Sequence, residues 1–122
     1  MTAKLYWFPV SHPSQAVKRE MELKGIPYEL AGVLPGNQGI HLRLAGFRGG
    51  TVPAMKLDGR RVQGSLAIAR ELDSIQPEPP LFPSDPGERA RIEELERWGD
   101  DELQNVPRQI LRWALTQDVG LR

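Results

Sequence analysis

The stretch that decides the fold is Thr51–Ile68, with the sequence TVPAMKLDGRRVQGSLAI. It contains a Val52-Pro53 pair, a short apolar run, an Asp58-Gly59 turn, a second short run, and Gly64-Ser65 where a helical pattern starts. Asp-Gly supplies the positive φ angles that a tight hairpin turn needs. Proline just before a strand suits a strand start or a cis peptide bond. Serine at a helix start leaves backbone N–H groups facing outward, which makes an anion site.

Upstream of this stretch, the pattern predicts a strand, a helix and a second strand. Lys4–Val10 is apolar and aromatic and is expected to be a strand buried on both faces. A turn leads into a helix with Gln15–Leu23 as its body, and Gly25 is a suitable residue to end it. Pro27–Val33 is the second predicted strand. At this length, the three elements predict a βαβ unit with parallel strands.

The remaining chain divides into further helices and a linker. A short, irregular helix is predicted over Ile40–Leu44, and a well-patterned helix is predicted over Ser65–Ile75. Residues 77–85 are rich in proline and are expected to form a stiff linker between residues 1–76 and a helical segment, 86–122.

The helical segment has a well-marked beginning. Asp85 is a predicted N-cap, followed by Pro86 and by Glu88 three residues after the cap. Pro107 is expected to kink or break the helix, because it removes a backbone donor and clashes with the preceding turn. Segments below about 40 residues rarely fold unaided, so 86–122 is not expected to form an independent domain.

Composition narrows the function classes. The chain has 122 residues, 39% hydrophobic and 26% charged, with a formal net charge of zero, which argues against a nucleic-acid partner. No apolar run approaches the roughly 20 residues of a membrane span, and the N-terminus lacks a signal-peptide pattern. The chain has no cysteine, and its two histidines, His12 and His41, lack partners at metal-ligand spacing, so no metal is expected.

The order of these features resembles the N-terminal domain of glutathione transferases. The motifs Lys24–Leu30 (KGIPYEL) and Pro79–Pro83 (PPLFP) stand in family order with the Val-Pro and Gly-Ser pairs. The resemblance implies an α/β, thioredoxin-like βαβ-α-ββα domain with a mixed four-stranded sheet, followed by an incomplete helical segment. By the same resemblance, 86–122 is the first helical part of a truncated all-helical domain. It also implies a cis peptide bond at Pro53.

The resemblance also implies a catalytic hydroxyl after the first strand. Ser11–Val17 (SHPSQAV) is similar to the Ser-Gln-Pro-Cys-Arg-Ala-Val turn of the theta class. By that match Ser11 donates a hydrogen bond to the glutathione sulfur and favours the thiolate, with Ser14 as the second candidate. An ordinary helix cap is the alternative role for either serine.

Five further residues are implied to bind the tripeptide. Val52, before a cis Pro53, pairs its backbone with glutathione, and Ser65 holds the γ-glutamyl carboxylate. Gly64 stands where the family usually has Glu, Asp or Gln, so a side-chain partner for the γ-glutamyl ammonium is missing. His41 lies where the family often has a cation near the glycyl carboxylate.

The implied function is that of a glutathione transferase-like protein, which uses glutathione as a cosubstrate to attack a small electrophile. Three alternatives remain open: a glutathione-dependent isomerase, a non-catalytic binding or scaffold protein, and a user of another low-molecular-weight thiol. A cytoplasmic location is expected. The apolar residues Ile110, Leu111 and Leu115 predict a homodimer, because each buried leucine contributes roughly 1.5–3 kcal/mol.

Overall fold

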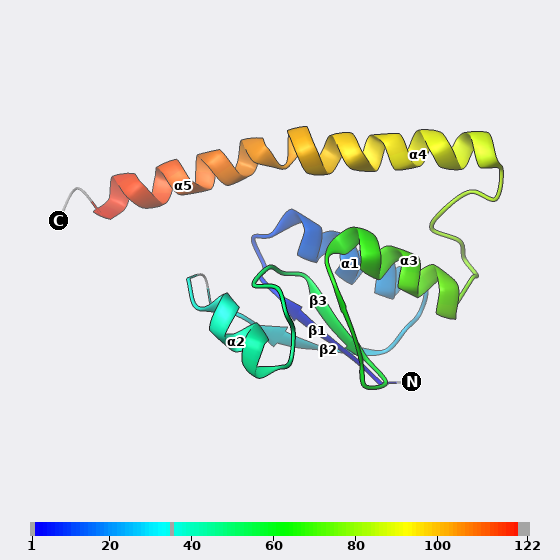
Figure 1. Cartoon of the computed structure of the whole chain (residues 1–122), viewed down its shortest axis with the longest axis horizontal. Coiled ribbons are helices and arrows are strands. Elements are labelled where there is room, and N and C mark those ends of the chain that lie inside the picture. The colour runs from blue at the N-terminus through cyan, green and yellow to red at the C-terminus, as the bar shows by residue number, and fades with distance from the viewer. Residues whose placement is uncertain (1, 35, 120–122) are drawn as a thin grey trace. The chain divides into compact units, whose positions relative to one another are not determined.

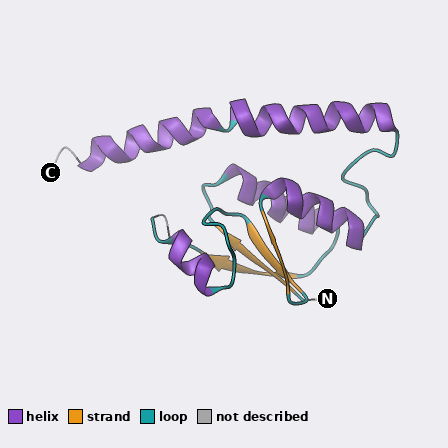
Figure 2. Ribbon diagram, viewed as in Figure 1, coloured by secondary structure: helices purple, strands orange, loops and turns teal. Residues whose placement is uncertain are grey.

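A computed structural model describes residues 2–34 and 36–119 of the chain and divides it into two compact units, residues 1–81 and 82–122. The first unit contains four strands and three helices, and the second is helical (Figures 1 and 2). The elements of the first unit are β1 (Ala3–Trp7), α1 (His12–Leu23), β2 (Tyr28–Gly32), α2 (Gln38–Leu44), β3 (Ala54–Leu57), β4 (Arg60–Gln63) and α3 (Ser65–Ile75).

The four strands form one mixed sheet in the order β2-β1-β3-β4. β1 pairs with β2 in parallel, as the βαβ prediction requires, and pairs with β3 in antiparallel register. β3 and β4 form the predicted hairpin, in which Asp58 and Gly59 have φ angles of 46° and 85°. The thioredoxin-like α/β fold with a mixed four-stranded sheet is therefore confirmed.

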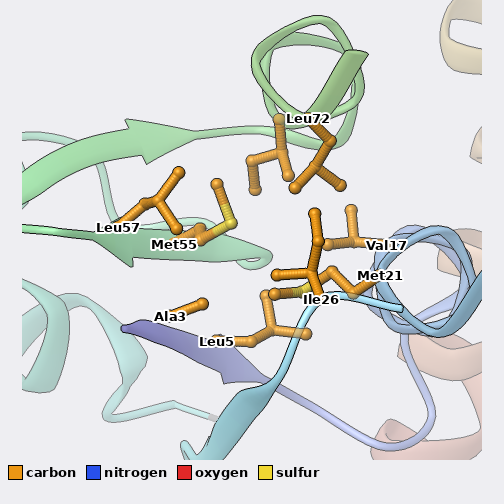
Figure 3. Close-up of a cluster of buried hydrophobic side chains, with 9 residues drawn as sticks. Ala3, Leu5, Val17, Met21, Ile26, Met55, Leu57 and Leu72 are labelled. Carbon is orange, nitrogen blue, oxygen red and sulfur yellow. The ribbon is translucent and has the colours of Figure 1, made fainter. Parts of the chain in front are cut away.

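One face of the sheet is covered by α1 and α3 (Figure 1). Side chains of β1 and β3 that are paired in register, such as Leu5 opposite Met55, point into this layer. They meet Met21 of α1 and Leu72 of α3 in a continuous apolar core (Figure 3). The buried members of the core are Ala3, Leu5, Val17, Met21, Ile26, Met55, Leu57, Ile68 and Leu72.

The opposite face carries a second, smaller cluster. Tyr6 and Ala54 are register partners whose side chains alternate with the first set, and they pack with Leu42 of α2. Phe8 and Val52, which lie just beyond the paired strands, pack against the same cluster. The sheet thus has apolar layers on both sides, but Lys4 is exposed, so the prediction that β1 is buried throughout is wrong at that position.

Helix α1 begins three residues earlier than predicted. Ser11 is its N-cap, and the Ser11 hydroxyl oxygen accepts a hydrogen bond from the Ser14 N–H at 3.3 Å. Pro13 fits in the first turn because backbone N–H groups there have no partner within the helix. The helix ends as predicted, with Gly25 at a φ of +66°.

A buried lysine connects the end of α1 to the end of α3. The Lys24 side chain has no solvent exposure, and its Nζ lies 2.8 Å from Asp73 Oδ1. Nζ also donates to the carbonyl oxygens of Pro79, at 2.8 Å, and of Gln76. Asp73 Oδ1 in turn accepts from the Leu81 N–H at 2.8 Å. One ammonium group therefore holds the segment after α3 against the domain.

The second unit contains α4 (Pro86–Trp98), a π-helical turn (Gly99–Leu103) and α5 (Asn105–Val119). Asp85 caps α4 by accepting from the Glu88 N–H at 2.9 Å, as predicted. The regular helix is interrupted at the π-helical turn, just before Pro107, which lacks the N–H that would bond the carbonyl of Leu103. No helix in residues 2–34 and 36–119 is long and apolar enough to cross a membrane.

Candidate functional site

The sheet topology brings three distant segments to one edge. β4 runs parallel to β1, because each pairs in antiparallel fashion with β3. Helices α1 and α3 follow β1 and β4, so both helices begin at the same edge of the sheet. Val52 and Pro53 precede the oppositely directed β3 and lie at that edge too. Ser11, Val52, Pro53 and Ser65 are therefore brought together.

Ser11 is held in a well-defined turn at this edge. Its N–H donates to the carbonyl oxygen of Phe8 at 2.9 Å, and the Gln15 side chain donates to the Pro9 carbonyl oxygen at 2.8 Å. Because the Ser11 hydroxyl acts as acceptor in the helix cap, its own proton can be donated elsewhere. The side chain is partly exposed, so a ligand can reach it.

Ser14 lies in a different environment. Its side chain is fully buried, and its hydroxyl oxygen accepts a hydrogen bond from the Phe8 N–H at 3.5 Å. A hydroxyl without solvent exposure supports the turn between β1 and α1 and does not face a bound molecule. Of the two serines, the geometry favours Ser11 as the group that contacts a ligand.

The Val52–Pro53 peptide bond is cis. Within residues 2–34 and 36–119, the backbone N–H and C=O of Val52 make no hydrogen bond to the protein. Pro53 is buried, and its carbonyl oxygen accepts from the Gly64 N–H at 2.9 Å. The main chain of Val52 can therefore pair with an extended peptide, as strand edges do.

Gly64 and Ser65 form the start of α3. Gly64 is the N-cap residue, and Ser65 is the first helical residue. The first helical hydrogen bond runs from the Ile68 N–H to the Gly64 carbonyl at 3.0 Å. The N–H groups of Ser65 and the next residues therefore have no partner within the helix and favour an anion.

Gly64 has a φ of +95° and a ψ of 141°, a backbone conformation that residues with a side chain rarely adopt. We expect Gly64→Ala to destabilise the domain by about 1–3 kcal/mol, because the strain lies in the backbone. Steric clash does not contribute, since a Cβ at this position meets nothing within 4 Å. Urea denaturation measures the effect.

Gly39→Ala is the matched control, because Gly39 lies in α2 and its Cβ would also meet open space. That change is expected to be neutral or slightly stabilising, since alanine has the higher helix propensity. An unchanged midpoint in Gly64→Ala would contradict the assignment of strain to residue 64.

His41 is placed by α2 on the other side of the sheet from α1 and α3. Its imidazole is exposed and contacts the Tyr6 ring edge-on, with ring centroids 6.0 Å apart. Val52 packs against the cluster that contains Tyr6. His41 therefore shares the α2 side of this edge with Val52, whereas Ser11 and Ser65 begin the two helices of the opposite layer.

Three interacting side chains on α1 and β2, Lys18, Glu22 and Tyr28, have shifted pKa values. A hydrogen bond from Lys18, and then one from Tyr28, lower the pKa of the Glu22 carboxyl. The bond to Glu22 raises the pKa of Lys18, and burial followed by that carboxylate raises the pKa of Tyr28. Among the described residues, no group of His, Asp and Glu side chains could hold a metal ion.

Two residues without a recognisable sequence motif hold the loop before Val52 by hydrogen bonds to its backbone. Arg61 and Gln63 of β4 contact the loop that leads to Val52. No local pattern marks these residues, because their partners lie 12 to 16 positions away.

A family model for the glutathione S-transferase N-terminal domain matches residues 5–80. The chain belongs to this family. The mouse maleylacetoacetate isomerase is 35% identical over 109 residues, which cover 84% of this chain and 50% of that protein.

Two solved glutathione transferase-like structures are also similar. Maleylacetoacetate isomerase from Anaeromyxobacter dehalogenans, with bound dicarboxyethyl glutathione and citrate in the active site, is 33% identical, with a TM-score of 0.62 over 77% of this chain and 46% of its own. A Sulfitobacter glutathione transferase homologue with bound glutathione is 25% identical, with a TM-score of 0.74 over 82% of this chain and 49% of its own. The chain spans half or less of the length of each of these relatives.

Proposed function

We propose that this domain binds glutathione at the edge formed by the starts of α1 and α3 and by Val52. The observation that carries the proposal is the meeting of Ser11, the Val52 backbone and the N-terminus of α3 at one edge of the sheet. The backbone of Val52 pairs with the tripeptide, and Ser65 with the first N–H groups of α3 holds the γ-glutamyl carboxylate. His41 provides the nearby imidazole on the side of the glycyl carboxylate.

Ser11 supplies the chemistry of the proposed site. Its hydroxyl donates to the glutathione sulfur, and a hydrogen bond to a charged acceptor is worth about 1.5–3 kcal/mol. The partial positive charge at the N-terminus of α1 acts in the same direction. The thiolate then uses its electron pair to form a bond with an electrophilic carbon of a small molecule, the leaving group on that carbon departs with the electron pair of the broken bond, and the proton that the thiol lost goes to solvent.

A glutathione-dependent isomerase is the second candidate. The maleylacetoacetate isomerases among the relatives favour it, at 35% and 33% identity. The same thiolate would add to the substrate and leave again after rotation about a bond, so Ser11 would have the same role. Gly64, which has no side chain, favours a third candidate, a domain that binds another thiol or has lost catalysis.

Two further proposals concern the assembly and its location. The apolar side chains of the second unit, including Ile110, Leu111 and Leu115, are 60%, 44% and 57% exposed. Burial of these side chains between two copies of the protein would be favourable, which supports a homodimer. The cytosol maintains a glutathione pool, which supports a cytoplasmic location.

Calorimetric titration with glutathione tests the proposed function. Titration of the intact chain with glutathione is expected to give a saturable heat of binding. Cysteinylglycine, which lacks the γ-glutamyl group, should bind more weakly than glutathione. The difference arises because that group meets the N-terminus of α3 in the proposed complex. A folded chain that binds no glutathione at millimolar concentration would refute the proposal and would favour the scaffold or another thiol.

A further inference from the structure

The loop between α2 and β3 is fastened by two side chains of β4. The Gln63 amide makes three hydrogen bonds to the loop backbone: its oxygen accepts from the Gly49 N–H at 2.9 Å, and its nitrogen donates to the carbonyls of Gly49, at 2.8 Å, and Thr51, at 3.0 Å. Arg61 Nε donates to the Ala45 carbonyl at 2.9 Å. Both donor and acceptor groups of the Gln63 amide are therefore used on one segment of main chain.

The loop has glycine at the points where these side chains approach most closely. A Cβ on Gly49 would lie 2.7 Å from Oε1 of Gln63, and a Cβ on Gly46 would lie 2.5 Å from Nε of Arg61. Such distances are shorter than real Cβ contacts, so each glycine permits an approach that a side chain would block. Gly46 also has a φ of +90°, a conformation that favours glycine.

The consequence for the site lies in the position of Val52. On one side, the carbonyl of Thr51 is held by the Gln63 amide. On the other side, the carbonyl of Pro53 is held by the Gly64 N–H. The two donors are consecutive residues, Gln63 and Gly64, so a single short segment fixes the chain immediately before and after Val52.

We infer that Gln63 is a positioning residue that orders the 49–51 loop and thereby presents the Val52 main chain to a bound tripeptide. The inference rests on the proposed function. A peptide that pairs with a strand edge binds more tightly when the edge is already ordered, because no binding free energy is then lost in ordering it. Without the amide, Gly49 and Thr51 exchange their protein partners for water, and residue 52 loses its fixed direction.

The test compares wild type with Gln63→Leu by glutathione calorimetry and by amide hydrogen exchange. We expect glutathione to bind about tenfold more weakly to Gln63→Leu, equivalent to about 1.4 kcal/mol. We also expect the Gly49 amide, whose N–H is bonded to Gln63 Oε1, to exchange faster, while the amides of β1 and β3 keep their protection. Gln63→Ala also removes all three hydrogen bonds but puts no bulky apolar group against the loop, so it should weaken binding to a similar degree, and it serves if Gln63→Leu does not fold.

Gln38→Leu is the matched control, since the Gln38 amide oxygen accepts from the Gly36 N–H in a different loop, at 2.9 Å. It should bind glutathione as wild type does. Equal affinity in wild type and Gln63→Leu, or unchanged exchange at Gly49, would overturn the inference while leaving the proposed function intact. A wild-type chain that binds no glutathione would refute the proposed function, and this inference with it.

Discussion

Replacing Lys24 by alanine is expected to destabilise the first unit by about 3–5 kcal/mol, because it removes one partner of a buried ion pair. The Lys24 side chain is fully buried, and the side chain of Asp73 is only 18% exposed. The carbonyls of Gln76 and Pro79 would lose their donor at the same time. A loss of this size is a large part of the 5–15 kcal/mol that stabilises an ordinary domain.

Urea denaturation of Lys24→Ala and wild type measures this effect, with the transition slope showing whether the unfolded states are comparable. Lys18→Ala is the matched control, because Lys18 forms an exposed ion pair with Glu22 in the same helix. The distance from Lys18 Nζ to Glu22 Oε1 is 2.7 Å. It should change stability little. Equal, small effects from both substitutions would show that Lys24 does not anchor the segment after α3.

Ser11→Ala is expected to raise the pKa of the bound glutathione thiol by about one to two units. The lost hydrogen bond to a charged acceptor is worth about 1.5–3 kcal/mol, and one pKa unit corresponds to about 1.36 kcal/mol. At a pH below both pKa values the thiolate fraction should fall about 10- to 100-fold. The pH dependence of thiolate absorbance in the complex measures it.

Two controls separate the hydrogen bond from the helix cap. Ser11→Gly weakens the helix cap only slightly but has no hydroxyl to donate, so it should also lose the thiolate. Ser14→Ala should cost stability without shifting the thiol pKa, because Ser14 is buried and bonds to Phe8. A thiol pKa that responds to Ser14 and not to Ser11 would reverse the two assignments.

Local chemistry explains why much of the fold could be predicted. The Asp58-Gly59 turn requires positive φ angles at both residues, and the structure has them. Helix α3 spans Ser65–Ile75, as its apolar spacing predicts. The cap of α4 at Asp85 is likewise readable from neighbouring residues, since capping involves partners only three positions apart.

Predictions that depended on burial or distant partners were less complete. The spacing of the family turn ranked Ser11 ahead of Ser14, but it could not show that packing buries the Ser14 side chain. The loop contacts of Gln63 and the anchor at Lys24 also escaped detection. Lys24 meets the Pro79 carbonyl 55 positions away, a pairing that no local pattern encodes.

The most direct test of the central claim is an NMR titration of the isotope-labelled intact chain with glutathione, followed at individual backbone amides. The largest changes are expected at the amides of Val52, Gly64, Ser65 and Ser11, which three separate segments bring to one edge of the sheet. Saturable changes confined to the second unit, or no changes at millimolar glutathione in a folded chain, would contradict it.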